Sequence, residues 1–378
     1  MITFQDNTIR DGMQQSGINK NLRTRIQVIE QIKDLKNITS VEIGMCTTIE
    51  DQRLLAAIIS HMGILQRPVV LTRLNKRDIE LTKTLTQERS GLVIKLLVPT
   101  SELHIREKLG ITVEELKKSL QGCLQQIENS GIGIDICIED ATRTDRKTLF
   151  NILDICDQYP IRFVTIADTV GCSTPFSYGQ LIKEIMLHRY SFEISVHCHN
   201  DLGMATANAF SGIMNGATQA ETTFLGIGER AGNTALDEIA YLAHKMMQEK
   251  DLDIPQIVEI SYKMQNILGQ NIPSNKALLG ENVFLHEAGI HQNGCLKNRE
   301  MYQFVLPEEI GMTEKLNFGI SGLSSSKVIR NKIADILGSD QGVEEILALY
   351  RNLSKTIKNI SIEEAVDSYL LDIGRYLV

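Results

Sequence analysis

The 378-residue sequence predicts an α/β fold, a (β/α)8 TIM barrel with a mostly helical C-terminal appendage. Eight short apolar runs alternate with segments of helical period over about the first 250 residues, which is the pattern of a parallel sheet whose strands are joined by helices. Polar residues recur at or just after the ends of these runs. In a closed barrel those positions meet at one face, where barrel enzymes carry their chemistry.

The predicted strands are residues 2–5, 41–43, 69–71, 92–98, 134–138, 163–166, 194–196 and 220–224. Segments such as 23–35 and 113–127 repeat apolar residues every three or four positions, which predicts amphipathic helices between the strands. A doubly wound open sheet is the alternative, but it would scatter the polar strand ends along one edge instead of gathering them in a ring. We therefore assign residues 1–250 to the barrel.

The remainder, residues 251–378, is expected to form a linker and helical subdomains. Residues 250–255 are polar and end in a proline, which is typical of a linker that leads into a new helix. Two amphipathic patterns and a loop-rich centre follow at residues 255–268, 343–357 and 271–326.

Composition excludes several classes of protein. With 39 basic and 47 acidic residues the net charge is −8, and no basic cluster could follow a phosphate backbone, so nucleic acid is not an expected partner. The seven cysteines are scattered and form no CxxC pair, which favours reduced thiols and a cytoplasmic location. No apolar run approaches the ~18 residues of a membrane span, and the N-terminus lacks a secretory pattern, so we expect a soluble protein.

A His-x-His pair follows the apolar run at residues 194–196. Because side chains alternate across a strand, His197 and His199 point the same way, with Cβ atoms roughly 6.5–7 Å apart, and both imidazoles can bind one ion. The ends of strands one, seven and eight are neighbours in a barrel, so Asp11 and Asn233 can join them. Two unrelated core histidines are the alternative. The mixed donors suit Mg²⁺, Mn²⁺ or Zn²⁺ as a Lewis acid.

Seven ordered motifs extend over most of the chain, at residues 6–12, 101–104, 139–145, 167–171, 197–203, 226–233 and 286–291. Together they resemble the acyl-CoA-dependent 2-oxo-acid synthases, the DRE-TIM metallolyases that include 2-isopropylmalate and homocitrate synthases. The resemblance implies an acyltransferase of amino-acid biosynthesis that condenses acetyl-CoA with a 2-oxo acid on a divalent metal. The product would be a 2-hydroxy dicarboxylate or tricarboxylate and free CoA.

Residue roles follow from the same resemblance. Asp11, His197 and His199 match the metal ligands of the family, and Asn233 matches a further metal contact.

Other positions match residues that act on the substrates. Arg10 matches the residue that polarises the ketone oxygen, and Thr169 the one that holds the carboxylate of the 2-oxo acid. Glu139 matches a catalytic acidic group, while His291 and Tyr302 match the base machinery for acetyl-CoA. These last two come from the C-terminal part, so the resemblance implies that residues 251–378 complete the active site, in a homodimer with exchanged C-terminal parts.

Some positions depart from the family pattern. Met13 stands where most synthases have Glu, and the segment Gly319–Gly322 lacks the usual basic pair. Lys95 interrupts an apolar strand, so it needs a carboxylate partner such as Glu42, or it contacts the substrate. The oxo acid stays open among 2-oxoisovalerate, 2-oxoglutarate and pyruvate. The alternative functions are a metal-dependent aldolase or 3-hydroxyacyl-CoA lyase of the same superfamily, and a non-catalytic binding protein derived from a synthase.

Overall fold

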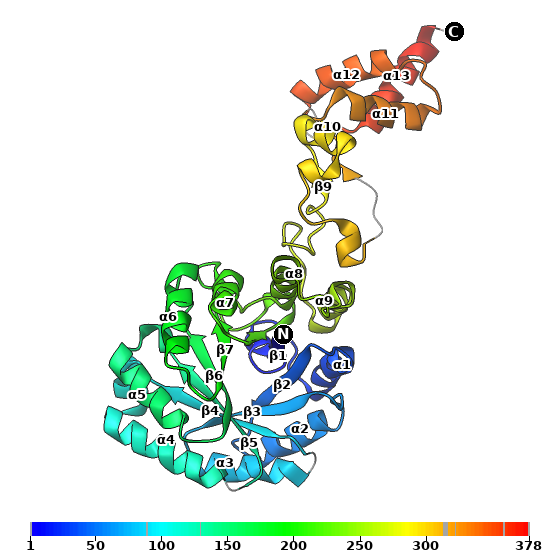
Figure 1. The fold of residues 1–378 in the computed structure, drawn as a ribbon. Coiled ribbons are helices and arrows are strands. Elements are labelled where there is room, and N and C mark those ends of the chain that lie inside the picture. The colour runs from blue at the N-terminus through cyan, green and yellow to red at the C-terminus, as the bar shows by residue number, and fades with distance from the viewer. Residues whose placement is uncertain are drawn as a thin grey trace. The chain divides into compact units, whose positions relative to one another are not determined.

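The computed structural model describes residues 2–87, 90–128, 130–312, 317–321, 323–357 and 360–376. Its first part is a closed barrel of eight parallel strands, in which β1 pairs with both β2 and β8 (Figure 1). The predicted TIM barrel is thus confirmed, and each predicted strand overlaps an observed one. The strands are β1 (Thr3–Asp6), β2 (Ile38–Met45), β3 (Arg67–Arg73), β4 (Val93–Pro99), β5 (Gly133–Glu139), β6 (Ile161–Asp168), β7 (Glu193–Cys198) and β8 (Gln219–Thr222).

Helices connect successive strands and lie outside the ring in Figure 1. Local chemistry sets where several of them begin. The side chains of Thr48 and Thr174 accept hydrogen bonds from the third residue of α2 and α6 in capping boxes, and Asp145 caps α5 in a similar way. The helices are α1 (Leu22–Ile32), α2 (Ile49–Ile59), α3 (Lys76–Lys83), α4 (Val113–Glu128), α5 (Arg146–Cys156), α6 (Pro175–Leu187), α7 (Ala205–Met214), α8 (Leu236–Met247) and α9 (Ile254–Leu268).

Short helical turns occur at several loops. The segment η3 (His104–Leu109), which follows β4, is a π-helix, a form that is frequent at functional sites. The others are 3₁₀ turns: η1 (Gly12–Gln14), η2 (Thr84–Gln87), η4 (Ala141–Arg143), η5 (Phe224–Gly226), η6 (Arg299–Met301) and η7 (Pro307–Ile310).

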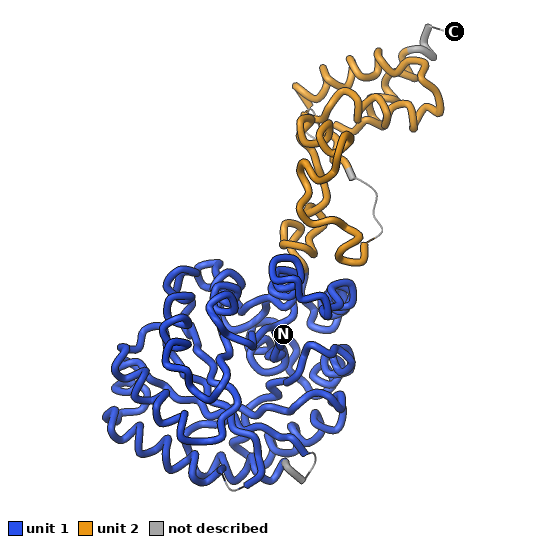
Figure 2. Tube along the Cα trace, viewed as in Figure 1, with its two compact units in different colours: residues 1–271 blue, residues 272–378 orange. Residues whose placement is uncertain are grey.

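The chain divides into two compact units, residues 1–271 and 272–378 (Figure 2). This boundary lies about 20 residues beyond the expected one, because α9 packs on α1 and α8 and so belongs to the barrel unit. No helix in the described ranges is long and apolar enough to cross a membrane.

The second unit is mostly helical. Its helices α11, α12 and α13 pack around a core that includes Ile333, Ile346 and Tyr350. The centre that was expected to be rich in loops contains one longer helix, α10, and a two-stranded parallel sheet. The elements are β9 (Leu285–His286), α10 (Gly289–Lys297), β10 (Asn317–Phe318), α11 (Ser326–Leu337), α12 (Val343–Thr356) and α13 (Ile362–Tyr376).

Candidate active site and metal centre

A tight turn after β1 presents Arg10 and Asp11 at the carboxyl end of the barrel. The carbonyl oxygen of Asn7 accepts the backbone N–H groups of Arg10 and Asp11, at 3.2 and 2.9 Å. The Asp6 carboxylate accepts the backbone N–H and the hydroxyl of Thr8, at 3.1 and 2.8 Å. Burial raises the pKa of Asp6 to about 7. The polar residues that follow β1 therefore build the turn as well as supplying site residues.

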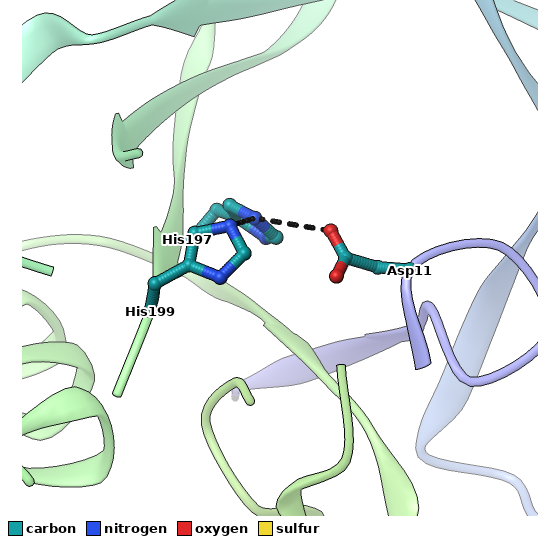
Figure 3. A group of neighbouring side chains, drawn as sticks. All are labelled: Asp11, His197 and His199. Carbon is teal, nitrogen blue, oxygen red and sulfur yellow. Dashed lines mark hydrogen bonds and ion pairs between the residues drawn. The ribbon is translucent and has the colours of Figure 1, made fainter. Parts of the chain in front are cut away.

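Asp11, His197 and His199 converge as the strand pattern predicted, and Figure 3 shows the three side chains close together. The Nε2 atoms of the two histidines are 3.2 Å apart, and His197 Nε2 lies 3.7 Å from Asp11 Oδ2. All three residues are buried, and their donor atoms lie within 4.8 Å of one another. Two nitrogens and a carboxylate oxygen at this spacing can hold one metal ion.

Asn233 completes this group from the loop after β8. Its Nδ2 donates to Asp11 Oδ1 at 2.9 Å and to the Ile227 carbonyl at 3.2 Å. Its Oδ1 is buried without a hydrogen-bond partner among the described residues, so a fourth donor atom, an oxygen, is available. Gly228 permits this approach, since a Cβ there would lie 2.0 Å from Asn233 Nδ2.

The protonation states of His199 and Asp11 favour the binding of a cation. Burial, and then the neighbouring His197, lower the pKa of His199 to about 4, so its imidazole is neutral at pH 7. Burial opposes the charge on Asp11, but Arg10, followed by the two histidines, lowers the pKa of Asp11 below its usual range. A neutral imidazole and an ionised carboxylate are the forms that bind metals. The residues present therefore fit a divalent cation.

Arg10 is held between two carboxylates, next to the three side chains of Figure 3. Its Nη1 lies 2.6 Å from Asp11 Oδ2, and its Nε contacts Glu42. Burial opposes the guanidinium charge, but Glu42 and Asp11 outweigh it and raise the pKa of Arg10. The side chain is 14% exposed and lines the pocket described below. Arg10 is thus a fixed cation at the barrel mouth.

Lys95 lies beneath the pocket and does not line it. Its Nζ lies 3.1 Å from Glu42 Oε2 and 2.5 Å from Glu221 Oε1, and all three side chains are at most 1% exposed. Of the two readings that the sequence allowed, the ion pair with Glu42 is the one formed. Burial opposes the ammonium charge, but Glu221 and then Glu42 raise the pKa of Lys95. The Lys95 ammonium is therefore paired with two carboxylates.

Glu221 is a residue that the sequence reasoning missed. Its Oε2 lies 3.2 Å from His197 Nδ1 and accepts the Asn7 amide at 2.8 Å, while Oε1 accepts the Thr165 hydroxyl at 2.6 Å. A carboxylate near Nδ1 orients the imidazole so that Nε2 faces a metal. Glu221 could have been identified from the sequence, because it stands in the middle of a strand, where a charged side chain needs buried partners.

Glu139 and Thr169 both line the pocket, at the ends of β5 and β6. Lys108, from the π-helix η3, places its Nζ 2.7 Å from both oxygens of Glu139, and His104 Nδ1 lies 3.6 Å from one of them. Thr169 Oγ1 accepts the backbone N–H of Asp140 at 2.8 Å, so its own hydroxyl proton can be donated elsewhere. Sequence reasoning missed Lys108, because helical spacing alone does not reveal a π-helix.

The pocket over these residues has a volume of about 300 Å³. It combines the three possible metal donors with Arg10 on one side and an apolar wall on the other. It is lined by Arg10, Asp11, Gln14, Met45, Leu71, Leu97, Cys137, Glu139, Ala167, Thr169, His197, His199, Glu229 and Arg230.

His291 and Tyr302 belong to the unit of residues 272–378 and lie together there. Their rings stack with centroids 4.3 Å apart, and the His286 ring is 6.3 Å from that of His291. A Cβ at Gly294 would lie 2.2 Å from the Tyr302 ring, so glycine is needed for this packing. His291 is exposed and Tyr302 is 38% exposed, so both can be reached by other groups.

The structure also shows where two positions that depart from the family pattern, Met13 and Gly319, lie. Met13 is buried at 1% exposure. In the segment Gly319–Gly322, the Gly319 carbonyl accepts the Gln292 amide at 2.8 Å, whereas Gly322 lies outside the described residues.

Comparison with known proteins gives consistent results along the chain. The HMGL-like family model matches residues 1–263, and the model of the homocitrate synthase post-HMGL domain matches residues 278–358. A solved HMG-CoA lyase from Acinetobacter baumannii has a TM-score of 0.63 and 16% identity, covering 76% of this chain and 97% of the lyase. At that identity the likeness shows the fold alone.

Curated relatives are more similar in sequence. The 2-isopropylmalate synthase of Sulfurisphaera tokodaii is 32% identical over 363 residues, which cover 95% of this chain and 92% of that protein. The (R)-citramalate synthase of Methanocaldococcus jannaschii is 30% identical, with 94% of this chain and 71% of that protein covered. The chain therefore belongs to the HMGL-like family, in the group of 2-isopropylmalate synthases and related acyl-CoA-dependent 2-oxo-acid synthases.

Proposed function

We propose that this protein is an acyltransferase that condenses acetyl-CoA with a 2-oxo acid in a metal-dependent, Claisen-type reaction. The products are a 2-hydroxy dicarboxylate or tricarboxylate and free CoA. The observation that carries the proposal is the group of Asp11, His197 and His199 beside Arg10, in a pocket of a chain whose relatives are named as synthases of this kind.

Asp11, His197 and His199 would hold the divalent cation, with the free Oδ1 of Asn233 as a further donor. When bound, Mg²⁺, Mn²⁺ or Zn²⁺ would supply Lewis acidity to the ketone of the 2-oxo acid. The Thr169 hydroxyl, whose oxygen already accepts the Asp140 N–H, would donate its proton to the substrate carboxylate. These contacts orient the oxo acid before the second substrate reacts.

Arg10 would act on the ketone oxygen. Negative charge grows on that oxygen while the new carbon–carbon bond forms, and a fixed guanidinium stabilises this charge without having to reorganise. Its two carboxylate partners keep the guanidinium in place, so the same contacts that bury Arg10 also orient it.

His291 and Tyr302 would activate acetyl-CoA. The imidazole takes a proton from the acetyl methyl group, and the resulting carbanion attacks the ketone carbon. The ketone oxygen then takes a proton, and water hydrolyses the thioester to release CoA. Glu139, whose two carboxylate oxygens accept hydrogen bonds from Lys108 Nζ, would take part in these proton transfers. We place these groups in a homodimer with exchanged C-terminal parts, so that each His291 serves its partner's barrel.

The location proposed is the cytoplasm. All seven cysteines are free thiols and six of them are buried, which supports a reducing compartment.

The test is the release of free thiol from acetyl-CoA, followed with a thiol reagent in the presence of a 2-oxo acid and Mg²⁺ or Mn²⁺. We expect release that depends on the oxo acid, is abolished by EDTA and is restored by the metal. The lyase alternative predicts cleavage of a 3-hydroxyacyl thioester, or of a 4-hydroxy-2-oxo acid for an aldolase, without condensation. A binding protein predicts neither reaction. Full activity in a rigorously metal-free preparation would contradict the metal-dependent mechanism.

A further inference from the structure

We infer that Lys108 is a positioning residue of the proposed reaction, which fixes the carboxylate of Glu139 in the pocket at the barrel mouth. The inference rests on the proposed function, in which Glu139 takes part in proton transfer. It extends that function to a residue that does not itself line the pocket. It follows from the contacts that the π-helix η3 makes with Glu139.

The segment that carries Lys108 is joined to Glu139 through the backbone. Pro99, the last residue of β4, is the register partner of Glu139 on β5. Thr100, the next residue, donates its backbone N–H and its hydroxyl to the Glu139 carbonyl, at 3.1 and 3.2 Å. The π-helix η3 begins shortly after this point, at His104. The start of η3 is therefore held close to the backbone of Glu139.

The side chains of η3 reach the Glu139 carboxylate. Lys108 Nζ lies 2.7 Å from each carboxylate oxygen, so the ammonium bridges the group. Within the described part of the chain, no other side chain donates a hydrogen bond to this carboxylate. His104 Nδ1 lies 3.6 Å from Oε1 and is buried without a hydrogen-bond partner among the described residues. Both groups of η3 approach Glu139, and Lys108 is the one within bonding distance.

The backbone at Glu139 is fixed by contacts that do not involve Lys108. Asp140, the next residue, has a left-handed backbone with a φ of 63°, and Arg143 binds both of its carboxylate oxygens at 2.8 Å. Thr169 Oγ1 accepts the Asp140 N–H at 2.8 Å. These contacts hold the end of β5 whether or not Lys108 is present. Loss of Lys108 should therefore release only the Glu139 side chain, which can then change its rotamer.

This ion pair can affect the reaction much more than it affects stability. The Lys108 side chain is 46% exposed and that of Glu139 is 13% exposed, and an ion pair that solvent reaches contributes little to folding. In contrast, a displacement of about 1 Å in a group that serves the reaction can lower the rate ~10²-fold. The ammonium therefore acts through the place that it gives to the Glu139 carboxylate.

The experiment measures kcat and KM with acetyl-CoA, Mg²⁺ and the most active of 2-oxoisovalerate, pyruvate and 2-oxoglutarate. We expect Lys108→Met to lower kcat by ~10–10²-fold and to leave both KM values within about 3-fold, because the substrate contacts are kept. Lys108→Arg should stay within about 5-fold of the unaltered kcat, since a guanidinium can bind both oxygens of a carboxylate. An Arg variant as slow as the Met variant, or a change in KM alone, would overturn the inference.

A double-mutant cycle tests whether Lys108 acts through Glu139. Glu139→Gln should lower kcat by ~10²-fold or more. Addition of Lys108→Met to this variant should change kcat by less than about 3-fold, because the carboxylate that Lys108 positions is already lost. If the two effects multiply in the double variant, Lys108 acts independently of Glu139 and the inference is wrong.

The matched control is Lys263→Met. Lys263 is 51% exposed, and its Nζ lies 2.7 Å from Glu259 on α9, so the exposure and the distance are close to those of the Lys108 pair. The control should keep both kcat and the thermal unfolding midpoint. Lys108→Met should keep the midpoint but lose kcat. A kcat equal to that of the control, or a fall in kcat that only follows the loss of folded protein, would overturn the inference.

Failure of the proposed function is seen separately, in the unaltered protein. If it releases no thiol with any of the three oxo acids, condensation is wrong, and the same variants are compared in the cleavage of a 3-hydroxyacyl thioester. Slower cleavage by Lys108→Met would retain the positioning role. Equal cleavage, or no reaction in the unaltered protein, would overturn the inference as well.

Discussion

Replacing Lys95 by methionine would remove the cation that Glu42 and Glu221 share inside the barrel. The three side chains are at most 1% exposed, and the Nζ contacts are 3.1 and 2.5 Å, so water cannot replace the ammonium. Glu42 keeps its contact with Arg10, whereas Glu221 keeps only neutral hydrogen-bond donors and His197. Removal of one partner from a buried ion pair costs about 3–5 kcal/mol. We expect a loss of unfolding free energy of this size.

The loss would be measured by urea denaturation followed by far-UV circular dichroism, since the chain has no tryptophan. The matched control is Lys117→Met, which removes an ammonium from a helical surface pair with Glu114 and should leave the denaturation midpoint unchanged. The double variant Lys95→Met/Glu221→Gln removes both charges and should regain part of the stability.

The Glu221→Gln replacement in the double variant should also weaken metal binding. Glu221 orients His197 through Nδ1, and loss of such an outer contact lowers metal affinity by about 10–100-fold. Calorimetry with Mn²⁺ measures this effect without any turnover. The reasoning is refuted if Lys95→Met unfolds within about 1 kcal/mol of the unaltered protein, or if the double variant is no more stable than the single one.

Three other predictions concern the site residues. Arg10→Ala should lower kcat by about 10²–10³ with Mn²⁺ affinity largely kept, and a change in KM alone would assign Arg10 to ground-state binding. Mixing inactive Asp11→Ala and His291→Ala proteins under subunit exchange should recover roughly a quarter of the activity of the unaltered protein, because half of the dimers are mixed and each mixed dimer holds one intact site. No recovery despite demonstrated exchange would refute an active site shared between subunits. In metal-free protein the contribution of His199 to stability should fall as the pH drops from about 6.5 toward 4, because the unfolded chain accepts a proton that buried His199 resists. Asp6, with a pKa raised to about 7, changes stability in the opposite direction, so the effect is measured as the difference between thermal unfolding curves of the unaltered protein and His199→Gln, and an equal pH dependence of the two would refute it.

The sequence by itself determined the barrel and much of the metal centre. Strand periodicity places His197 and His199 on one face, and chain order in a closed barrel makes the ends of β1, β7 and β8 neighbours, so Asp11 and Asn233 meet them. These inferences need only the alternation of side chains along a strand and the topology of the ring. Both are encoded locally, in runs of a few residues.

Only the tertiary structure shows which side chains pair with each buried charged residue. Lys95 and Glu221 are 126 positions apart, and the Glu that pairs with Arg10 could not be chosen from the sequence among several strand carboxylates. Lys108 reaches Glu139 only because η3 is a π-helix. Residues of α9 joined the barrel unit through contacts with α1, which lies over 200 positions earlier. The apolar wall of the pocket likewise combines single residues from five strands, Met45, Leu71, Leu97, Cys137 and Ala167. Such contacts depend on register and closure of the whole ring, because burial makes each charge pair with whatever side chain the opposite strand brings within reach.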